Sequence, residues 1–188
     1  MPPAEEPQER ESSLFQEVLE TILLAVVLFV ALRTVVQSTV VLSHSMDPTL
    51  SEGQYLLVNK LAYKIGTPAR GDIAVFHSPE DHDTVLIKRV IGLPGEEIVV
   101  SGTQAYVNGV HLAEGYLAAG QSSGNWGPFV LGEGQYLMLG DNRTNSNDSR
   151  FFGPVSEETI IGKAWISIWP PGTIYAGTLA LATTVPAP

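Results

Sequence analysis

Residues 84–94 read Thr-Val-Leu-Ile-Lys-Arg-Val-Ile-Gly-Leu-Pro, with two adjacent cations inside a run of strand-forming side chains. Successive side chains of an extended strand point to opposite faces. Lys88 and Arg89 therefore lie on opposite faces, and we expect one of them to point into the domain. Burial disfavours the charged form of an amine, so an inward Lys88 would become a usable base, whereas a lysine that reaches solvent from an edge strand would not.

The chain on both sides of this strand alternates short apolar runs with Gly and Pro, which is typical of a mainly β domain. Asn108-Gly109 between two such runs predicts a two-residue hairpin turn, because both positions tolerate positive φ. We also expect single helical turns at residues 61–65 and 156–161, and a Gly- and Ser-rich loop at residues 115–127. The predicted strands are residues 54–58, 73–77, 85–91, 97–100, 105–107, 135–139 and 163–168.

An uncharged apolar run occupies residues 21–32, between Glu20 and Arg33. This run is shorter than the roughly 20 residues that cross a bilayer. A helix over residues 18–37 is long enough if the two flanking charged side chains reach the membrane interfaces. We predict one transmembrane anchor rather than a buried core helix or a cleaved signal peptide, whose first segment would be basic.

Composition restricts the remaining possibilities. The 188 residues fit one compact domain, and 20 acidic against 10 basic side chains argue against a nucleic-acid partner. The absence of cysteine excludes a disulfide framework, a thiolate zinc site and a cysteine nucleophile. The expected organisation is an acidic segment at residues 1–17, the anchor at 18–37, a catalytic domain at 38–170 and a flexible tail at 171–188.

A nucleophile must then be sought among the serines. Ser45 lies just after the predicted anchor, in the sequence Ser-His-Ser-Met-Asp-Pro-Thr-Leu of residues 43–50. His44 is its neighbour, but adjacent residues of an extended chain point apart, which argues against a Ser-His pair. The histidines also lack the spacing of metal ligands, so we expect neither a metal nor another cofactor.

The most polar stretch of the chain covers residues 140–153, directly after an apolar strand. Asp141 or Asp148 could form a bidentate pair with Arg143 or Arg150, and such pairs fix geometry near a site. A calcium-binding loop is the alternative, but the terminal bidentate glutamate of an EF-hand is missing.

Taken together, these stretches resemble bacterial type I signal peptidases, which are membrane-bound Ser-Lys proteases. The resemblance covers nearly the whole chain after residue 15. After the anchor, four motifs follow in order: Ser-x-Ser-Met-x-Pro-Thr-Leu at 43–50, Arg-Gly-Asp-Ile-x-Val-Phe at 70–76, Lys-Arg-Val-Ile-Gly-Leu-Pro-Gly-Glu at 88–96, and Gly-Asp-Asn-Arg-x-x-Ser-x-Asp-Ser-Arg-x-x-Gly at 140–153.

The resemblance implies specific roles for residues in these motifs. It implies a signal-peptidase-like β-fold with Ser45 as the nucleophile and Lys88 as the general base. The Ser43 hydroxyl and the Ser45 amide would form the oxyanion hole. The supporting residues that it implies are Ser146, which would orient the lysine, and the charged side chains Asp148, Arg150, Asp141 and Arg143.

Two residues depart from the family pattern Pro-Ser-Gly-Ser-Met, because this chain has Leu42 and His44 in place of Pro and Gly. The larger His44 side chain beside the nucleophile keeps an alternative open, namely a catalytically impaired membrane-anchored binding module of the same fold. A self-cleaving repressor domain with a Ser-Lys dyad is a further alternative, which the anchor and the negative charge oppose.

The resemblance implies an enzyme that removes signal peptides from secreted preproteins, through an acyl-enzyme, after small residues at positions −1 and −3, and we expect a monomer. Its partners would be preprotein signal peptides and the lipid bilayer of the cell membrane. This activity requires a cytoplasmic N-terminus and an extracytoplasmic catalytic domain. Basic residues do not decide the orientation, because Arg10 and Arg33 supply one on each side of the anchor.

Overall fold

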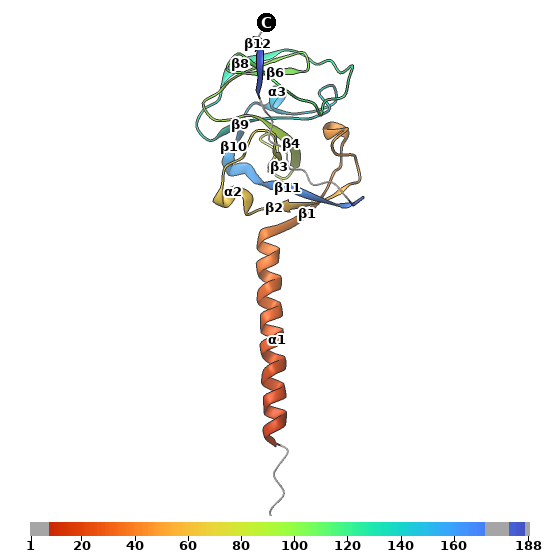
Figure 1. Cartoon of the computed structure of the whole chain (residues 1–188), viewed down its shortest axis with the longest axis vertical. Helices are drawn as coiled ribbons and strands as arrows, with labels where there is room; N and C mark the ends of the chain where they lie inside the picture. The colour runs from red at the N-terminus through yellow and green to blue at the C-terminus, as the bar shows by residue number, and fades with distance from the viewer. Residues whose placement is uncertain (1–7, 172–180, 187–188) are drawn as a thin grey trace, which may run out of the picture. The chain divides into compact units, whose positions relative to one another are not determined.

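The computed structural model of this chain describes residues 8–171 and 181–186. It divides into two compact units, Met1–Val36 and Gln37–Pro188, and each is described by itself. The first unit is the helix α1, Gln8–Val35 (Figure 1). Within it, Leu14–Val35 is long and apolar enough to cross a membrane, spanning about 33 Å at 1.5 Å per residue.

The helix ends two residues earlier than expected, because strand β1, Val36–Val40, begins where the anchor was predicted to continue. Val35 and Val36 are β-branched, and such side chains lose rotamer freedom in a helix but fit an extended strand. The N-terminal end also differs, since α1 starts at Gln8 and so includes part of the segment that we expected to precede the anchor.

The second unit contains a seven-stranded sheet in the order β1-β2-β11-β3-β4-β9-β10. Neighbouring strands from β2 to β10 pair antiparallel. Besides β1, its strands are β2 (Tyr55–Asn59), β3 (Ile73–His77), β4 (Val85–Gly92), β9 (Gln135–Leu139), β10 (Val155–Ser156) and β11 (Ile160–Trp169). The short helices are η1 (His44–Met46), α2 (Ala62–Ile65), α3 (Ser149–Phe152) and η2 (Glu157–Thr159).

A five-stranded antiparallel sheet completes the domain in the order β12-β7-β6-β5-β8. Its strands are β5 (Glu97–Ser101), β6 (Gln104–Val107), β7 (Val110–Leu112), β8 (Trp126–Val130) and β12 (Leu181–Pro186). The predicted hairpin joins β6 to β7, with positive φ at both Asn108 and Gly109. The mainly β fold is thus confirmed.

Two expectations about the second sheet differ from the structure. The loop expected at residues 115–127 ends earlier than predicted, because β8, a strand that the sequence analysis did not include, begins at Trp126. Part of the expected flexible tail forms β12, which pairs with β7 at the sheet edge, while residues 172–180 and 187–188 lie outside the described residues. Pairing to β7 satisfies backbone groups of β12, a long-range effect that local composition does not reveal.

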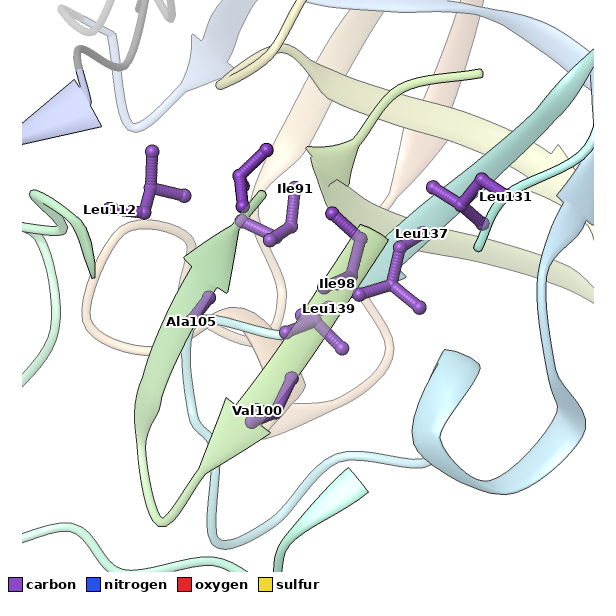
Figure 2. Close-up of a cluster of buried hydrophobic side chains, with 9 residues drawn as sticks. Ile91, Ile98, Val100, Ala105, Leu112, Leu131, Leu137 and Leu139 are labelled. Atoms are coloured by element: carbon purple, nitrogen blue, oxygen red, sulfur yellow. The ribbon is translucent and has the colours of Figure 1, made fainter. Parts of the chain in front are cut away.

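The described residues form three buried apolar clusters, and two of them include residues next to the polar site in the sequence, Leu139 and Met46. One cluster lies between the two sheets (Figure 2) and contains Ile91, Ile98, Val100, Ala105, Val107, Leu112, Leu131, Leu137 and Leu139. The other surrounds η1 and contains Val41, Met46, Leu50, Leu56, Ile73 and Ala164. Because Met46 and Leu50 are fully buried, the turn that carries Ser45 is anchored on its C-terminal side.

Candidate active site

Ser45 and Lys88 are brought together although 43 residues separate them in the chain. The Lys88 ammonium nitrogen lies 2.7 Å from Ser45 Oγ, and both side chains are buried. Lys88 Nζ also donates to the Ile87 carbonyl at 3.1 Å. Ser43 Oγ lies 3.1 Å from Ser45 Oγ, at the start of the same turn. This is the arrangement of a nucleophile, a base and a nearby hydroxyl donor.

The 3₁₀ turn η1 fixes the direction of Ser45. Its backbone closes through hydrogen bonds from the Asp47 amide to the His44 carbonyl and from the Leu50 amide to the Met46 carbonyl. Asn142, which follows strand β9, supports the turn by two hydrogen bonds. Its amide donates to the Ser45 carbonyl at 3.0 Å, and its side chain donates to the His44 carbonyl at 3.1 Å.

The environment of Lys88 shifts its protonation equilibrium toward the neutral amine. Burial lowers the pKa of Lys88 from 10.5 to about 8, against the opposing effect of the carboxylates of Asp148 and Asp141, which raise it. A base with a pKa near the working pH has a substantial neutral fraction and can accept a proton from a hydroxyl. Lys88 is thus chemically suited to activate Ser45.

The expectation that only one of the adjacent cations points inward is wrong, since Lys88 and Arg89 are both buried, at 3% and 6% exposure. Arg89 forms a bidentate ion pair with Asp141, at 2.8 Å from Nε to Oδ1 and 2.6 Å from Nη2 to Oδ2. Thr49 donates a further hydrogen bond to Asp141 at 2.5 Å. The ion pair between Arg89 on β4 and Asp141, which follows β9, offsets the cost of burying the Arg89 charge.

The other acidic residue of the polar stretch pairs as the sequence suggested. Asp148 accepts hydrogen bonds from Arg150 Nε and Nη2, both at 2.8 Å, and it caps α3 through the Arg150 amide. Asp148 also accepts a hydrogen bond from the Gly140 amide at 3.0 Å. The remaining pairing differs from the expectation, because Arg143 pairs with Glu114 instead of either aspartate.

Ser146 lies near this site, but its side chain makes no hydrogen bond to the described residues that would give it a role. Its hydroxyl oxygen is buried and has no hydrogen-bond partner in the part of the chain that the structure describes. The interaction with Lys88 that the resemblance implies is therefore absent from the described contacts, and its orienting role stays a prediction.

Gly140 is a residue that the sequence analysis did not single out, and it leaves room for the nucleophile. A Cβ atom at this position would lie 2.3 Å from Ser146 Oγ and 2.5 Å from the Ser45 carbonyl oxygen. Both distances are shorter than atoms tolerate, so the turn carrying Ser45 would have to move.

We therefore expect Gly140→Ala to lower kcat/KM by about 100-fold, the loss associated with a displacement near 1 Å. Gly124→Ala is the matched control, because a Cβ there meets no atom within 4 Å. Kinetics and urea unfolding of both variants check this, and wild-type kinetics in a folded Gly140→Ala variant would contradict it.

A groove of about 440 Å³ leads away from Ser45 and Lys88. Its lining residues come from two segments, Thr39, Val40, Val41, Leu42, Ser43, Ser45 and Met46 on one side, and Asp83, Thr84, Val85, Leu86, Ile87 and Lys88 on the other. β1 is an edge strand, and β9 pairs with β4 only from Arg89 to Gly92. The groove is thus flanked by two strand edges.

The His44 side chain, which kept an impaired binding module open, does not point at the dyad. Its ring is 57% exposed, with Nδ1 3.0 Å from Asp47 and Nε2 3.3 Å from Glu52. The two carboxylates hold the His44 ring away from Ser45 and Lys88. The 2.7 Å contact between Lys88 Nζ and Ser45 Oγ is therefore intact beside it.

Sequence reasoning missed Thr49, Asn142 and Gly140, although all three lie inside the motifs that carry the resemblance. These residues could have been found in the sequence, because each is a polar residue or a glycine at a motif position to which no role had been given. Glu114 and Tyr116 had no such signal, because they lie outside the four motifs.

Comparison with known proteins identifies the family. The family model for signal peptidase, peptidase S26, matches residues 15–169. A protein from Synechocystis sp. named "Probable signal peptidase I-2" is 42% identical over 82% of this chain and 73% of its own length. Signal peptidase I from Leptolyngbya laminosa is 41% identical over 87% and 84%, respectively.

More distant relatives carry the same description. Signal peptidase IB from Staphylococcus aureus is 34% identical over 85% of this chain and 92% of its own length. A crystal structure of a signal peptidase I from Enterococcus faecalis is 32% identical, with a TM-score of 0.45, and covers 52% of this chain and 97% of that chain. From the family match and these identities, the chain belongs to the signal peptidase family, peptidase S26, as a type I signal peptidase, a serine endopeptidase that removes signal peptides.

Proposed function

We propose that this signal peptidase is membrane-anchored and cleaves secreted preproteins with a Ser45–Lys88 dyad, after small residues at −1 and −3. The observation that carries the dyad is the 2.7 Å contact between Lys88 Nζ and Ser45 Oγ in a buried environment. The lowered pKa of Lys88 supports its role as the base.

In the proposed acylation step, neutral Lys88 takes the proton of the Ser45 hydroxyl as Ser45 Oγ bonds to the scissile carbonyl carbon. The Ser43 hydroxyl and the Ser45 amide donate to the developing oxyanion, a contribution whose loss typically costs 10² to 10³ in rate. Protonated Lys88 then returns its proton to the leaving amine as the peptide bond breaks. Water hydrolyses the resulting ester with Lys88 again as the base.

The groove supports a mode of substrate binding. An extended peptide can lie between β1 and the first half of β4 and hydrogen-bond to their free backbone edges. Val41, Met46 and Ile87 place apolar side chains along this groove. We propose that the part of this groove next to the dyad accepts small side chains at −1 and −3 and rejects larger ones.

The apolar helix supports membrane anchoring. Leu14–Val35 has the length and composition of a single span, and no side chain in it is buried by the protein. We infer a cytoplasmic N-terminus and an extracytoplasmic catalytic unit, because the cleavage site of a secreted preprotein emerges on the outer side of the membrane. We also propose that the enzyme is a monomer. A C-terminal tag digested by protease added to intact spheroplasts would support this orientation, and a protected tag would overturn it.

The deciding experiment is the cleavage of a labelled preprotein by the full chain in detergent, with the product identified by mass spectrometry. Below pH 8 we expect kcat/KM to fall about tenfold per pH unit, because protonation of Lys88, whose pKa is about 8, removes the base. Above that pH the lysine is neutral and the rate reaches a plateau. Ser45→Ala should give no cleavage at any pH, and residual Ser45→Ala activity would exclude this nucleophile.

A further inference from the structure

The segment between β7 and β8 carries two side chains, Glu114 and Tyr116, that contact the buried arginines Arg143 and Arg89. Glu114 forms an ion pair with Arg143 in which the two side chains are 3% and 0% exposed. Arg143 Nε also donates to the Gly140 carbonyl at 3.0 Å. Glu114 therefore holds the guanidinium that supports the backbone directly after β9.

Tyr116 links this pair to the second buried arginine. Its hydroxyl donates to Glu114 and lies 3.3 Å from Arg143 Nη2. Its ring lies under the guanidinium of Arg89, with 3.9 Å between Arg89 Cζ and the ring centroid. A cation over an aromatic face at this distance is an attractive contact, and desolvation strengthens it.

Arg89 in turn is the ion-pair partner of Asp141. The contacts thus run from the Glu114–Arg143 pair through the Tyr116 hydroxyl and ring to Arg89 and its carboxylate. No role in the proposed reaction has been given to either Glu114 or Tyr116.

We propose that Tyr116 is a positioning residue of the peptidase, whose ring holds Arg89 against Asp141 and so keeps the negative charge of Asp141 compensated beside Lys88. Glu114 fixes the tyrosine hydroxyl and thereby the place of the ring. The inference rests on the Ser45–Lys88 dyad proposed above, because it acts through the protonation of Lys88.

The contacts of Tyr116 affect Lys88 through the charged side chains around the lysine. The carboxylates that act on Lys88 are Asp148 and Asp141, and both raise its pKa against the effect of burial. Arg150 is paired with Asp148, and Arg89 is paired with Asp141. If Arg89 loses the ring beneath it and moves, the charge of Asp141 is less compensated, and the pKa of Lys88 rises.

The test is the pH profile of kcat/KM for the full chain in detergent. We expect Tyr116→Leu to move the acidic limb upward by about half a pH unit, because the ammonium form of Lys88 is favoured. At pH values below the pKa of Lys88, the kcat/KM of the variant is then about threefold lower than that of the wild type. On the alkaline plateau the two values are equal. Tyr116→Phe retains the ring under Arg89 but loses the hydroxyl that Glu114 holds, so its limb should move by clearly less than that of Tyr116→Leu.

The matched control is Tyr63→Leu, which removes another tyrosine whose hydroxyl donates to a buried carboxylate, that of Asp72, at 3.0 Å. Asp72 is not among the charges that act on Lys88, so the limb should not move. Tyr116→Met provides the same test if Tyr116→Leu does not fold.

Equal loss of activity at every pH in a folded Tyr116→Leu or Tyr116→Met variant would overturn the inference, because support of the fold alone does not move the limb. So would a limb shifted equally by Tyr63→Leu or by Tyr116→Phe. Failure of the dyad is distinguishable, because the wild-type enzyme would then show no limb that depends on Lys88.

Discussion

Replacing Lys88 with methionine will lower kcat/KM by about 10⁴-fold or more, because the proposed base for the Ser45 proton is lost. Methionine matches the length of the lysine stem and needs no hydrogen-bond partner. The fold should therefore survive, since burial already disfavours the charged form of Lys88. Kinetics of preprotein cleavage and urea unfolding of the same preparation check both statements.

The control for this prediction is Lys163→Met on strand β11, which β3 separates from β4 in the same sheet. Lys163 pairs with Asp72 at 2.5 Å, and its side chain is 30% exposed. Its loss should change stability modestly and kcat/KM by less than about threefold, as for other ion pairs that reach solvent. Lys88→Met activity within tenfold of the wild type would remove Lys88 from the mechanism.

Replacing Asp141 with alanine will lower the free energy of unfolding by about 3 to 5 kcal/mol, the typical cost of breaking a buried ion pair from one side. Asp141 is fully buried and accepts hydrogen bonds from Arg89 and Thr49. Without it, the guanidinium of Arg89 stays buried and loses its counter-charge. Urea unfolding of the full chain in detergent measures the loss, with Asp83→Ala as the exposed control, for which no loss is expected.

A double variant separates the charge imbalance from lost packing. Arg89→Met combined with Asp141→Leu removes both charges, and buried ion pairs are often replaced by apolar side chains with little loss of stability. We expect this variant to recover most of the stability lost in Asp141→Ala. If it is as unstable as Asp141→Ala, an unpaired buried guanidinium is not the cause.

The local parts of the fold were predictable from the sequence. Strands β3 and β9 begin and end at the predicted residues, and the Asn108–Gly109 hairpin forms as expected. These features depend on short continuous apolar runs and on the φ angles that single residues tolerate, both of which are visible in a short window. β1 and β8 were missed, because their strand state depends on sheet neighbours that lie far away in the chain.

The candidate site was predictable in part. Ser45, Lys88 and the Asp148–Arg150 pair were named from the motifs, and the structure places each pair in direct contact. The Arg89–Asp141 pair spans 52 residues, and no local pattern shows which carboxylate a given arginine will reach. For the same reason the interaction of Glu114 with Arg143 was not foreseen.

The sequence by itself determined the apolar helix and the mainly β character of this signal peptidase, because both depend on residue type and short-range pattern. It also predicted Ser45 as the nucleophile and Lys88 as the base, through the motifs that resemble the family. The tertiary structure decided which charges compensate one another, how deeply Lys88 is buried and where the groove runs. Those properties depend on desolvation and on distances between segments far apart in the chain, and they set the protonation state of the base.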